Sequence, residues 1–435
     1  MDSIRICGGT PLHGSVRVQG SKNAALPILA ASVMLPGESI LHNCPDIADV
    51  RFMCGLMEHV GCQVRREKDT LIVDASGVCM EEAGKQLLPA EYVGGMRSSV
   101  IFMGAMLGRC GRVSLQYPGG CVIGKRPIDL HVTALEQMGA HIEFYDGGMH
   151  ADAKRLKGSH IRLPMPSVGA TENVLLAAVC AEGTTLLEQA AREPEINALC
   201  DFLRQAGGEI SAAEGRVQIE GKKPLHGCEY TVPADRIVAG TYLFGCMAAG
   251  GEIRLEQAPV REMDAVLRVL TRMGGKLSET ERELICRRSG KLYPAGRVKT
   301  EYYPGYPTDL QSPLLSVMSL ASGSSFLTET IFEDRFHIVR ELNRMGAEIT
   351  IEGNTAAVPG GHILHGAQVR ARELRGGAAL VVAGLAAEGD TVVTGKEFID
   401  RGYEDIAAGF SALGAKVSYE KYNDENGGRK IAPAC

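Results

Sequence analysis

One pattern of apolar and polar positions recurs six times along the chain. Each copy is a helical run that ends in a hydrophobic residue, a glycine and a small residue, and an alternating strand follows at once. The intervals between successive glycines, 78, 68, 67, 72 and 68 residues, are far too regular for chance. Each copy is therefore predicted to be one folding unit, a repeat, and the glycines that mark the six repeats are Gly61, Gly139, Gly207, Gly274, Gly346 and Gly414.

A second pattern marks the first half of every repeat. It is a helical run with small and apolar residues on all faces, which predicts a helix buried on every side. A glycine closes each run and is expected to be a left-handed helix cap. The β-branched residues that follow, as in residues 184–187, favour a strand. The six runs cover residues 29–37, 102–111, 175–183, 243–251, 315–323 and 381–389.

The two patterns together predict an α/β fold. Each repeat is expected to contain a strand, a buried helix, a strand, a second helix and a closing hairpin such as residues 348–358. Six repeats exceed the roughly 250 to 300 residues that one core holds, so two lobes of three repeats are predicted, with a boundary near residues 226–233. Helices inside and sheets outside make each lobe an inside-out α/β barrel. A cleft between two lobes is a favoured ligand site.

Composition narrows the class of protein. The 435 residues are 45% hydrophobic and 23% charged with a formal net charge of −6, which excludes a general binder of nucleic acid. The start of the chain lacks a cationic leader, and no uninterrupted apolar run approaches roughly 18 residues, so we expect a cytoplasmic protein without membrane contact. Thirteen cysteines without paired spacing indicate a reducing compartment. No metal or nucleotide-cofactor signature occurs, so no cofactor is predicted.

One cysteine, Cys121, differs from the others in its surroundings. It lies in a Gly-rich turn before Lys125 and Arg126, whereas Cys54 and Cys180 lie in apolar helical runs and are predicted to be buried. The neighbouring cations favour the thiolate, which is the reactive form of the side chain. Packing explains such a residue poorly, so Cys121 is predicted to be functional.

Three further segments have residue types suited to a site at a helix start. Lys22 follows Gly20 and Ser21, and an ammonium at a helix N-terminus makes an anion site, although a solvated lysine is the plain alternative. The run Ser167-Val168-Gly169 is either a phosphate-binding turn or only an N-cap. Asp309 occupies the same position in the fifth repeat as Lys22 does in the first. It is either a proton acceptor or an ordinary N-cap.

The six repeats, the run Ser21-Lys22-Asn23-Ala24-Ala25-Leu26-Pro27 and the Gly-Gly-Cys loop together resemble the enolpyruvyl transferase family over about residues 4–419. The resemblance implies transfer of the enolpyruvyl group of phosphoenolpyruvate to the 3-hydroxyl of UDP-N-acetylglucosamine. Phosphate leaves through a tetrahedral intermediate, in the first committed step of peptidoglycan precursor synthesis. The resemblance also implies lobes of residues 21–232 and of residues 1–20 with 233–435.

The same resemblance assigns roles to residues. It makes Cys121 the general acid at the methylene carbon of phosphoenolpyruvate and the point of alkylation by fosfomycin, Asp309 the general base, and Lys22 and Arg401 further catalytic residues. Because the chain is acidic overall, its site cations have to concentrate positive charge around two anionic small-molecule substrates. The expected substrate contacts are Lys22, Asn23, Arg97, Arg126, Pro127, Ile128, Asp129, Leu130, Ser167, Val168, Gly169, Asp309, Ile331, Arg335, Arg375 and Arg401.

The chain departs from the family's usual pattern at Glu373, Val238, Phe398 and the pair Met165-Pro166, which bears on affinity or loop closure. Two alternatives stay open. The first is the sister enzyme 5-enolpyruvylshikimate-3-phosphate synthase, against which the Gly-Gly-Cys loop and residues 126–130 argue. The second is a catalytically silent protein that binds sugar nucleotide, against which Cys121 and Asp309 argue. A monomer or weak oligomer is expected.

Overall fold

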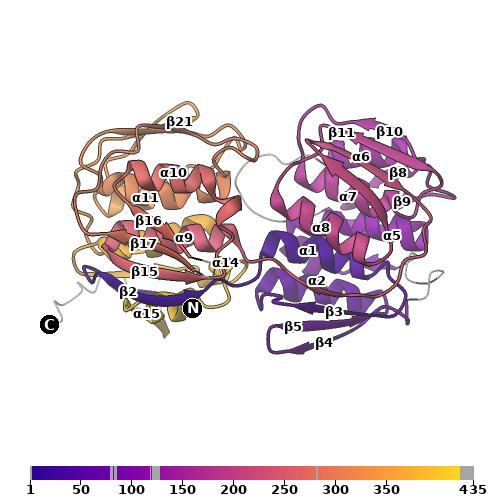
Figure 1. The fold of residues 1–435 in the computed structure, drawn as a ribbon, viewed down its shortest axis with the longest axis horizontal. Helices are drawn as coiled ribbons and strands as arrows, with labels where there is room; N and C mark the ends of the chain where they lie inside the picture. The colour runs from indigo at the N-terminus through magenta and orange to yellow at the C-terminus, as the bar shows by residue number, and fades with distance from the viewer. Residues whose placement is uncertain are drawn as a thin grey trace. The chain divides into compact units, whose positions relative to one another are not determined.

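The computed structural model describes residues 2–78, 82, 86–117, 119, 128–280 and 283–421. These residues form two compact lobes (Figure 1). The first lobe contains the described residues between Gln19 and Pro233, and the second contains those up to Val18 and from Ala234 onward. Each lobe has a hydrophobic core of its own.

The first lobe contains three four-stranded sheets among its described residues, in the orders β14-β3-β5-β4, β6-β7-β9-β8 and β10-β11-β13-β12. Its strands are β3 Glu38–His42, β4 Gln63–Glu67, β5 Thr70–Asp74, β6 Leu87–Leu88, β7 Arg112–Gln116, β8 His141–Tyr145, β9 Gly148–Asp152, β10 His160–Arg162, β11 Thr184–Glu188, β12 Glu209–Ala213, β13 Arg216–Glu220 and β14 Glu229–Thr231. Its helices are α1 Lys22–Ser32, α2 Ala48–His59, α4 Ala90–Gly95, the 3-10 helix η1 Arg97–Ile101, α5 Phe102–Cys110, α6 Asp129–Gln137, α7 Val168–Ala178 and α8 Pro194–Gln205.

The second lobe has the same organisation, with sheets in the orders β16-β17-β15-β2, β18-β19-β21-β20 and β22-β23-β1-β24. Its strands are β1 Asp2–Cys7, β2 Leu12–Arg17, β15 Gly251–Glu256, β16 Lys276–Glu279, β17 Glu283–Arg288, β18 Arg297–Lys299, β19 Ser325–Thr328, β20 Thr350–Glu352, β21 Thr355–Val358, β22 Gln368–Arg370, β23 Asp390–Thr394 and β24 Lys416–Lys421. Its helices are α9 Arg236–Ala249, η2 Val260–Glu262, α10 Asp264–Arg272, η3 Thr308–Leu310, α11 Gln311–Leu320, α12 Ile338–Arg344, α13 Leu374–Ala386, α14 Lys396–Ile399 and α15 Ile406–Ala412.

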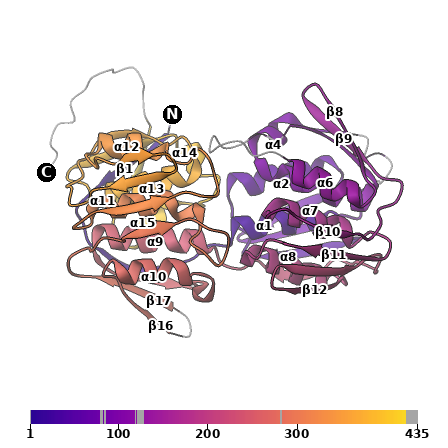
Figure 2. The ribbon, with the colours of Figure 1, turned by 90° about the horizontal axis from the view of Figure 1, so that it is seen from above.

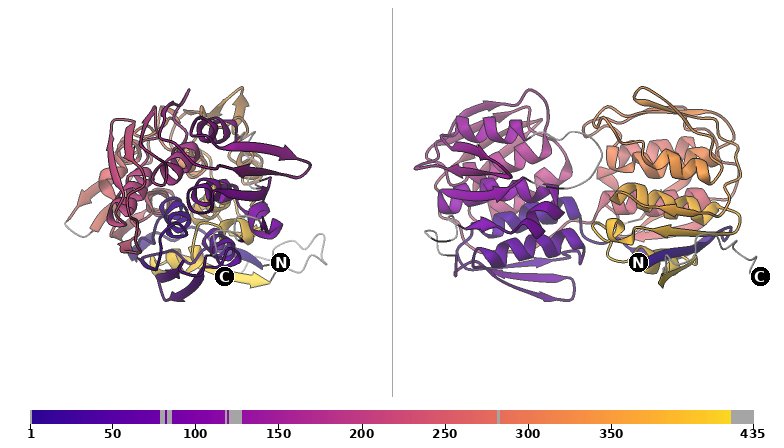
Figure 3. Two further views of the ribbon diagram at one scale, coloured as in Figure 1. Left: turned by 90° about the vertical axis from the view of Figure 1, so that its right-hand side faces the viewer. Right: turned by 180° about the vertical axis from the view of Figure 1, so that it is seen from behind.

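The predicted α/β fold with buried helices is confirmed. Within each lobe the helices lie inside and the sheets outside (Figures 2 and 3). In the third repeat, the buried helix α7 connects β10 to β11, and these two strands pair parallel. The hairpin of β12 and β13 completes the sheet with antiparallel pairs. Every residue of α7 from Ala170 to Ala178 is buried, and apart from Thr171, Glu172 and Asn173 these residues are apolar.

The glycines that mark the repeats have the backbone conformation that their position requires. All six have positive φ, from 84° at Gly414 to 103° at Gly61, a region open to glycine at little cost. The glycines that close the buried helices behave differently. Gly111 is the left-handed cap of α5, as predicted, but α7 ends at Ala178 and Gly183 stands at the entry to β11. The cap prediction is therefore wrong for α7, since a turn separates the glycine from the helix. It is also wrong for α1, α9, α11 and α13, whose C-cap residues are Val33, Gly250, Ala321 and Ala387.

The two ends of the second lobe's chain complete one sheet together. β1 lies between β23 and β24 and pairs antiparallel with both, so the closing hairpin predicted for every repeat is wrong for the sixth. Arg5 holds this arrangement, with Nη2 2.5 Å from Asp390 Oδ2 and Nη1 3.0 Å from Glu420 Oε1. In the first lobe too, strands from the two ends of the chain segment pair, since β14 lies beside β3 and is parallel to it. These two sheets are therefore completed by strands that lie far away in the sequence, β1 in the second lobe and β14 in the first.

Candidate active site

In the second lobe, Asp309 lies between two buried arginines. Arg335 Nη2 is 2.8 Å from Asp309 Oδ1, and Arg375 Nη2 is 3.1 Å from Asp309 Oδ2. The side chains of Arg335 and Arg375 are 2% and 3% exposed, whereas that of Asp309 is 28% exposed. Asp309 lies inside η3, and the N-cap residues of η3 and α11 are Pro307 and Leu310, so the N-cap alternative is wrong. Asp309 is the member of this cluster that solvent, and hence a ligand, reaches most easily.

The start of α13 positions Arg375. Glu373 is the N-cap of this helix, and its carboxylate accepts hydrogen bonds from the backbone N–H groups of Arg375, at 2.7 Å, and Gly376. Glutamate in place of the usual aspartate therefore still caps the helix. Burial by itself lowers the pKa of Arg375, but the charge of Asp309 and further contributions from Tyr403 and Asp235 hold this pKa above its ordinary value. The guanidinium stays charged although it is buried.

The turn that contains Arg401 packs against the same helix start. Gly402 lies against Leu374, where an added Cβ would be 2.7 Å from Leu374 Cδ2. The ring of Tyr403 lies 5.8 Å from the guanidinium of Arg375, and its hydroxyl is 2.7 Å from Thr241 Oγ1 in α9. The structure therefore brings the half-buried Arg401 to the helix that begins at Leu374.

Ile331 was predicted to offer backbone contacts to a ligand. Its N–H donates to Glu329 Oε1 at 2.8 Å, so a backbone contact has to come from its carbonyl group. Sequence analysis missed Glu329, a buried carboxylate two residues before Ile331. An acidic residue directly after a buried strand was the signal available.

In the first lobe, Lys22 forms an ion pair with a residue that sequence analysis did not single out. Its Nζ is 2.7 Å from Asp49 Oδ2, and Asp49 is almost fully buried in the first turn of α2. Lys22 is itself the first residue of α1, and Ser21 caps the helix by accepting from the N–H of Ala24 at 3.3 Å. A lysine at a helix N-terminus opposes the helix dipole, and the carboxylate of Asp49 offsets that repulsion.

A buried amide, Asn173, joins the other segments that were predicted to bind substrate. Its Oδ1 accepts from the N–H of Gly104 at 2.6 Å, and its Nδ2 lies 3.1 Å from the carbonyl oxygen of Val100 in η1, which begins at Arg97. The same Nδ2 lies 2.7 Å from His131 Nδ1 in α6, which begins at Asp129. Because the amide nitrogen can only donate, His131 accepts at Nδ1 and has its proton at Nε2.

Gly169 lies against the ring of the same histidine. An added Cβ at Gly169 would be 2.7 Å from His131 Cε1, so a side chain does not fit there. The preceding Ser167 caps α7, with its Oγ 3.4 Å from the N–H of Ala170. The structure therefore brings together three predicted segments, Arg97 in η1, residues 128–130 and residues 167–169, around Asn173 and His131.

Three predicted residues, Cys121, Arg126 and Pro127, lie outside the described residues. Among the described residues, no group of His, Cys, Asp and Glu side chains is arranged to hold a metal ion. In that same part of the chain, no helix combines the length and apolar character needed to cross a membrane.

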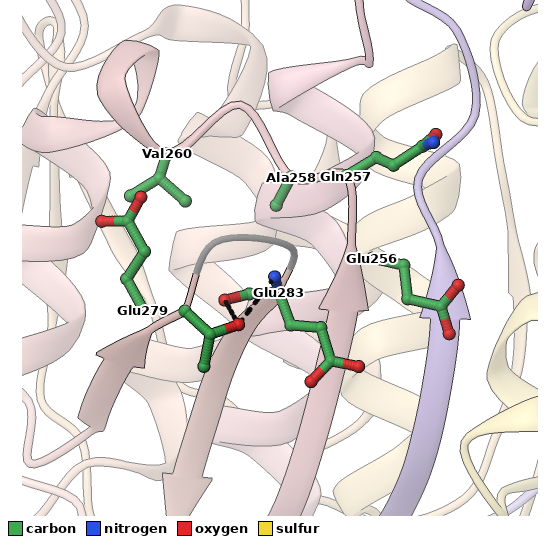
Figure 4. Close-up of a pocket in the computed structure, with 7 residues that line it drawn as sticks. Glu256, Gln257, Ala258, Val260, Glu279 and Glu283 are labelled. Atoms are coloured by element: carbon green, nitrogen blue, oxygen red, sulfur yellow. Dashed lines mark hydrogen bonds between the residues drawn. The ribbon is translucent and has the colours of Figure 1, made fainter.

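A separate pocket of about 580 Å³ lies in the second lobe beside β15, β16 and β17 (Figure 4), and none of the predicted site residues lines it. Carboxylates dominate its polar lining, so the pocket repels anionic ligands. Its lining residues are Glu256, Gln257, Ala258, Val260, Glu279, Thr280 and Glu283.

Known proteins resemble the chain over nearly its whole length. The family model described as EPSP synthase (3-phosphoshikimate 1-carboxyvinyltransferase) matches residues 6–410. The chain is 43% identical over 420 residues to UDP-N-acetylglucosamine 1-carboxyvinyltransferase 2 of Caldanaerobacter subterraneus subsp. tengcongensis, which covers 96% of this chain and 99% of the relative. It is 44% identical over 418 residues to UDP-N-acetylglucosamine 1-carboxyvinyltransferase of Solidesulfovibrio magneticus, with 96% and 99% covered.

Two solved structures share its architecture. The enolpyruvyl transferase NikO from Streptomyces tendae superposes with a TM-score of 0.86 at 25% identity, covering 96% of this chain and 98% of that protein. An EPSP synthase from Acinetobacter baumannii superposes with a TM-score of 0.75 at 19% identity, covering 97% and 100%. The second likeness concerns the fold alone.

Proposed function

Because the chain belongs to the EPSP synthase family of enolpyruvyl transferases, we propose that it transfers the enolpyruvyl group of phosphoenolpyruvate to the 3-hydroxyl of UDP-N-acetylglucosamine. The relatives support enolpyruvyl transfer in peptidoglycan precursor synthesis. The identity of the acceptor is what we propose. The relatives named for this acceptor are 43% and 44% identical to the chain, against 19% for the EPSP synthase of Acinetobacter baumannii. The sugar nucleotide is therefore favoured over shikimate 3-phosphate.

The observation that carries the proposal is the partly exposed carboxylate of Asp309 between two buried arginines. Ion pairing fixes the direction of this carboxylate, as a general base requires. In the proposed reaction Asp309 takes the proton of the sugar 3-hydroxyl, whose oxygen bonds to C2 of phosphoenolpyruvate, while the Cys121 thiol protonates C3. The tetrahedral intermediate then loses a proton from C3 and expels phosphate, which leaves the enolpyruvyl ether.

Two arginine nitrogens support a ligand at Asp309. Arg375 Nη1 and Arg335 Nε are buried and have no hydrogen-bond partner among the described residues. Leaving a buried N–H of a charged group unpaired is costly, and an anionic ligand removes that cost. We assign Arg375 and Arg401 to the phosphate and carboxylate of phosphoenolpyruvate. Lys22 and Asn23, at the start of α1, are assigned to both substrates.

The segments around Asn173 are proposed to bind the nucleotide. α7 begins at Val168, directly after Ser167 and with Gly169 in its first turn, and the N-terminus of a helix suits a diphosphate. Ile128, Asp129 and Leu130, with Arg126 and Pro127, are assigned to the uridine and diphosphate groups. Arg97 and the carbonyl group of Ile331 are assigned to the sugar, with Arg335 beside it.

Phosphate release from phosphoenolpyruvate tests the proposal directly. The wild-type protein and Cys121→Ala are each assayed with UDP-N-acetylglucosamine or with shikimate 3-phosphate as acceptor. Cysteine-dependent release with the sugar nucleotide alone is the expected result. Release with shikimate 3-phosphate instead assigns the chain to the sister enzyme, and silence with both acceptors favours a binding protein. Fosfomycin is expected to add one adduct mass to the wild type and none to Cys121→Ala.

A further inference from the structure

Glu329, which follows β19, is a buried carboxylate surrounded by donors. It is 2% exposed. Its Oε1 accepts from Thr300 Oγ1 at 2.8 Å and from the N–H groups of Ile331 and Phe332 at 2.8 and 3.2 Å. Its Oε2 accepts from Thr308 Oγ1 at 2.8 Å. A carboxylate only accepts hydrogen bonds, so it sets the direction of each of these four bonds.

The bond from Thr308 leads to the proposed base. Since the single hydroxyl proton of Thr308 goes to Glu329, its oxygen is left to accept from Arg335 Nη1 at 3.0 Å. The other terminal nitrogen of Arg335, Nη2, then meets Asp309 Oδ1 at 2.8 Å. A continuous chain of hydrogen bonds therefore runs from Glu329 through Thr308 and Arg335 to Asp309.

Glu329 also holds the opposite side of the same arginine. The guanidinium of Arg335 lies 5.1 Å from the centre of the Phe332 ring, a cation–π contact. The backbone N–H of Phe332 is bonded to Glu329. One carboxylate thus fixes both the hydroxyl that Arg335 donates to and the turn that carries its aromatic neighbour.

We propose that Glu329 is a positioning residue for enolpyruvyl transfer. It touches no substrate, but it orients the guanidinium of Arg335 and, through it, the carboxylate of Asp309. The inference rests on the proposed function in so far as Asp309 is the general base. A base must meet its proton within hydrogen-bond reach, and a misplacement of about 1 Å can cost 10²-fold in rate.

The test compares three variants that each disturb one bond of Glu329. Glu329→Gln keeps the shape of the side chain, and its amide oxygen can serve the three donors at Oε1. Its NH2 group then faces Thr308 as a donor, which forces the Thr308 proton away from residue 329. Thr308→Val removes the acceptor for Arg335. Thr300→Val is the matched control, because it removes a bond of Glu329 that does not lead to Arg335, together with a bond that Thr300 Oγ1 accepts from the N–H of Thr330.

We expect Glu329→Gln and Thr308→Val each to lower kcat roughly 10-fold or more, with KM for phosphoenolpyruvate changed far less. Thr300→Val is expected to keep kcat within about twofold of the wild type. The double variant Glu329→Gln/Thr308→Val should be no slower than the slower single variant, because both changes break one chain of bonds. Equal losses in Thr300→Val, or additive losses in the double variant, would overturn the inference.

A second readout is independent of turnover. NMR of arginine side chains labelled with ¹⁵N reports rotation of the Arg335 guanidinium. Faster rotation is expected in Glu329→Gln and Thr308→Val, and wild-type rotation in Thr300→Val. Unchanged rotation in the first two variants counts against Glu329 as a positioning residue. If the wild type itself fails to use UDP-N-acetylglucosamine, the proposed function fails, while the NMR comparison still decides whether Glu329 orients Arg335.

Discussion

The groups around Asp309 and those around Asn173 are buried polar clusters built in opposite ways. Asp309 in the second lobe is held by two charged guanidinium groups, whereas Asn173 in the first lobe is held by two backbone groups and a histidine ring. Buried charges are stable only when paired and hydrogen-bonded, so the first cluster is sensitive to the loss of any member. The second cluster is held by hydrogen bonds between uncharged groups, which fix its shape and the tautomer of His131. We infer that the first serves the chemical step and the second serves recognition.

Several predicted site residues occupy the same place in different repeats, the start of a core helix. Core helices begin at Lys22, at Val168 after Ser167, and at Leu374 before Arg375, and η3 with Asp309 leads into α11. Helix starts leave backbone N–H groups unpaired and suit anions, so a repeat architecture supplies several anion-binding positions at once. What differs between repeats is the side chain at that position.

The largest expected effect is on the charged cluster. Asp309→Asn should lower kcat roughly 10²- to 10⁴-fold, because the base is lost. It should also lower the free energy of unfolding by about 3 kcal/mol, since two buried guanidinium groups lose their counterion. Phosphate release and urea unfolding measure the two effects. Glu301→Gln, which breaks the exposed pair of Lys299 and Glu301, is the control and should leave both unchanged. Wild-type kcat in Asp309→Asn would refute the assignment.

The second-largest effect is expected at the ion pair of Lys22 and Asp49, and it tests whether this buried pair depends on both partners as the Asp309 cluster does. Asp49→Asn should leave the ammonium without its buried partner, so we expect KM for phosphoenolpyruvate to change by about 10-fold and stability to fall by about 3 kcal/mol. Asp46→Asn breaks the ion pairs of an exposed aspartate with Arg51 and Arg66 and is the matched control. If the two variants behave alike, Asp49 does not position Lys22.

The groups around Asn173 should respond differently, with a change in KM rather than in kcat. Asn173→Ala removes three hydrogen bonds and leaves buried groups unpaired, so we expect a loss of about 2 to 3 kcal/mol in stability. KM for the sugar nucleotide should rise several-fold while kcat stays near the wild-type value. Asn197→Ala, at an exposed position of α8, is the control. A fall in kcat with unchanged KM would remove the distinction between the two clusters.

The smallest effect on activity is expected at Glu172, next to Asn173 in α7. Burial, with Glu195 and Glu193 nearby, raises the pKa of Glu172 well above its ordinary value. Between the ordinary and the raised pKa the folded protein binds the proton more tightly than the unfolded chain. The contribution of Glu172 to stability is therefore present at low pH and is lost as pH rises through this window, by about 1.4 kcal/mol per pH unit.

Glu172→Gln removes this dependence and should be more stable than the wild type at neutral pH. Urea unfolding from pH 4 to pH 8 measures the slope of stability against pH. Glu58→Gln, at an exposed position of α2, should keep the wild-type slope. An unchanged slope in Glu172→Gln would mean that another group titrates in this window.

Sequence by itself determined the six repeats and the buried helices, because these follow from the local periodicity of apolar residues. It also singled out Lys22 and Asp309 by residue type at a helix start, and the family resemblance added Arg375. Tertiary structure alone decided their partners. Asp309 and Arg375 are 66 residues apart and Gly104 and Asn173 are 69 apart, so these pairs join adjacent repeats.

The same reason explains what local pattern missed. Asp49, Asn173 and Glu329 are ordinary polar residues in sequence, and their roles arise only when burial removes water and neighbouring helices supply donors. Tertiary structure likewise decides that β1 pairs with β23 and β24 and that β14 pairs with β3, because these strands are far apart in the sequence. Periodicity specifies each repeat, whereas contacts between distant segments specify which polar side chains meet.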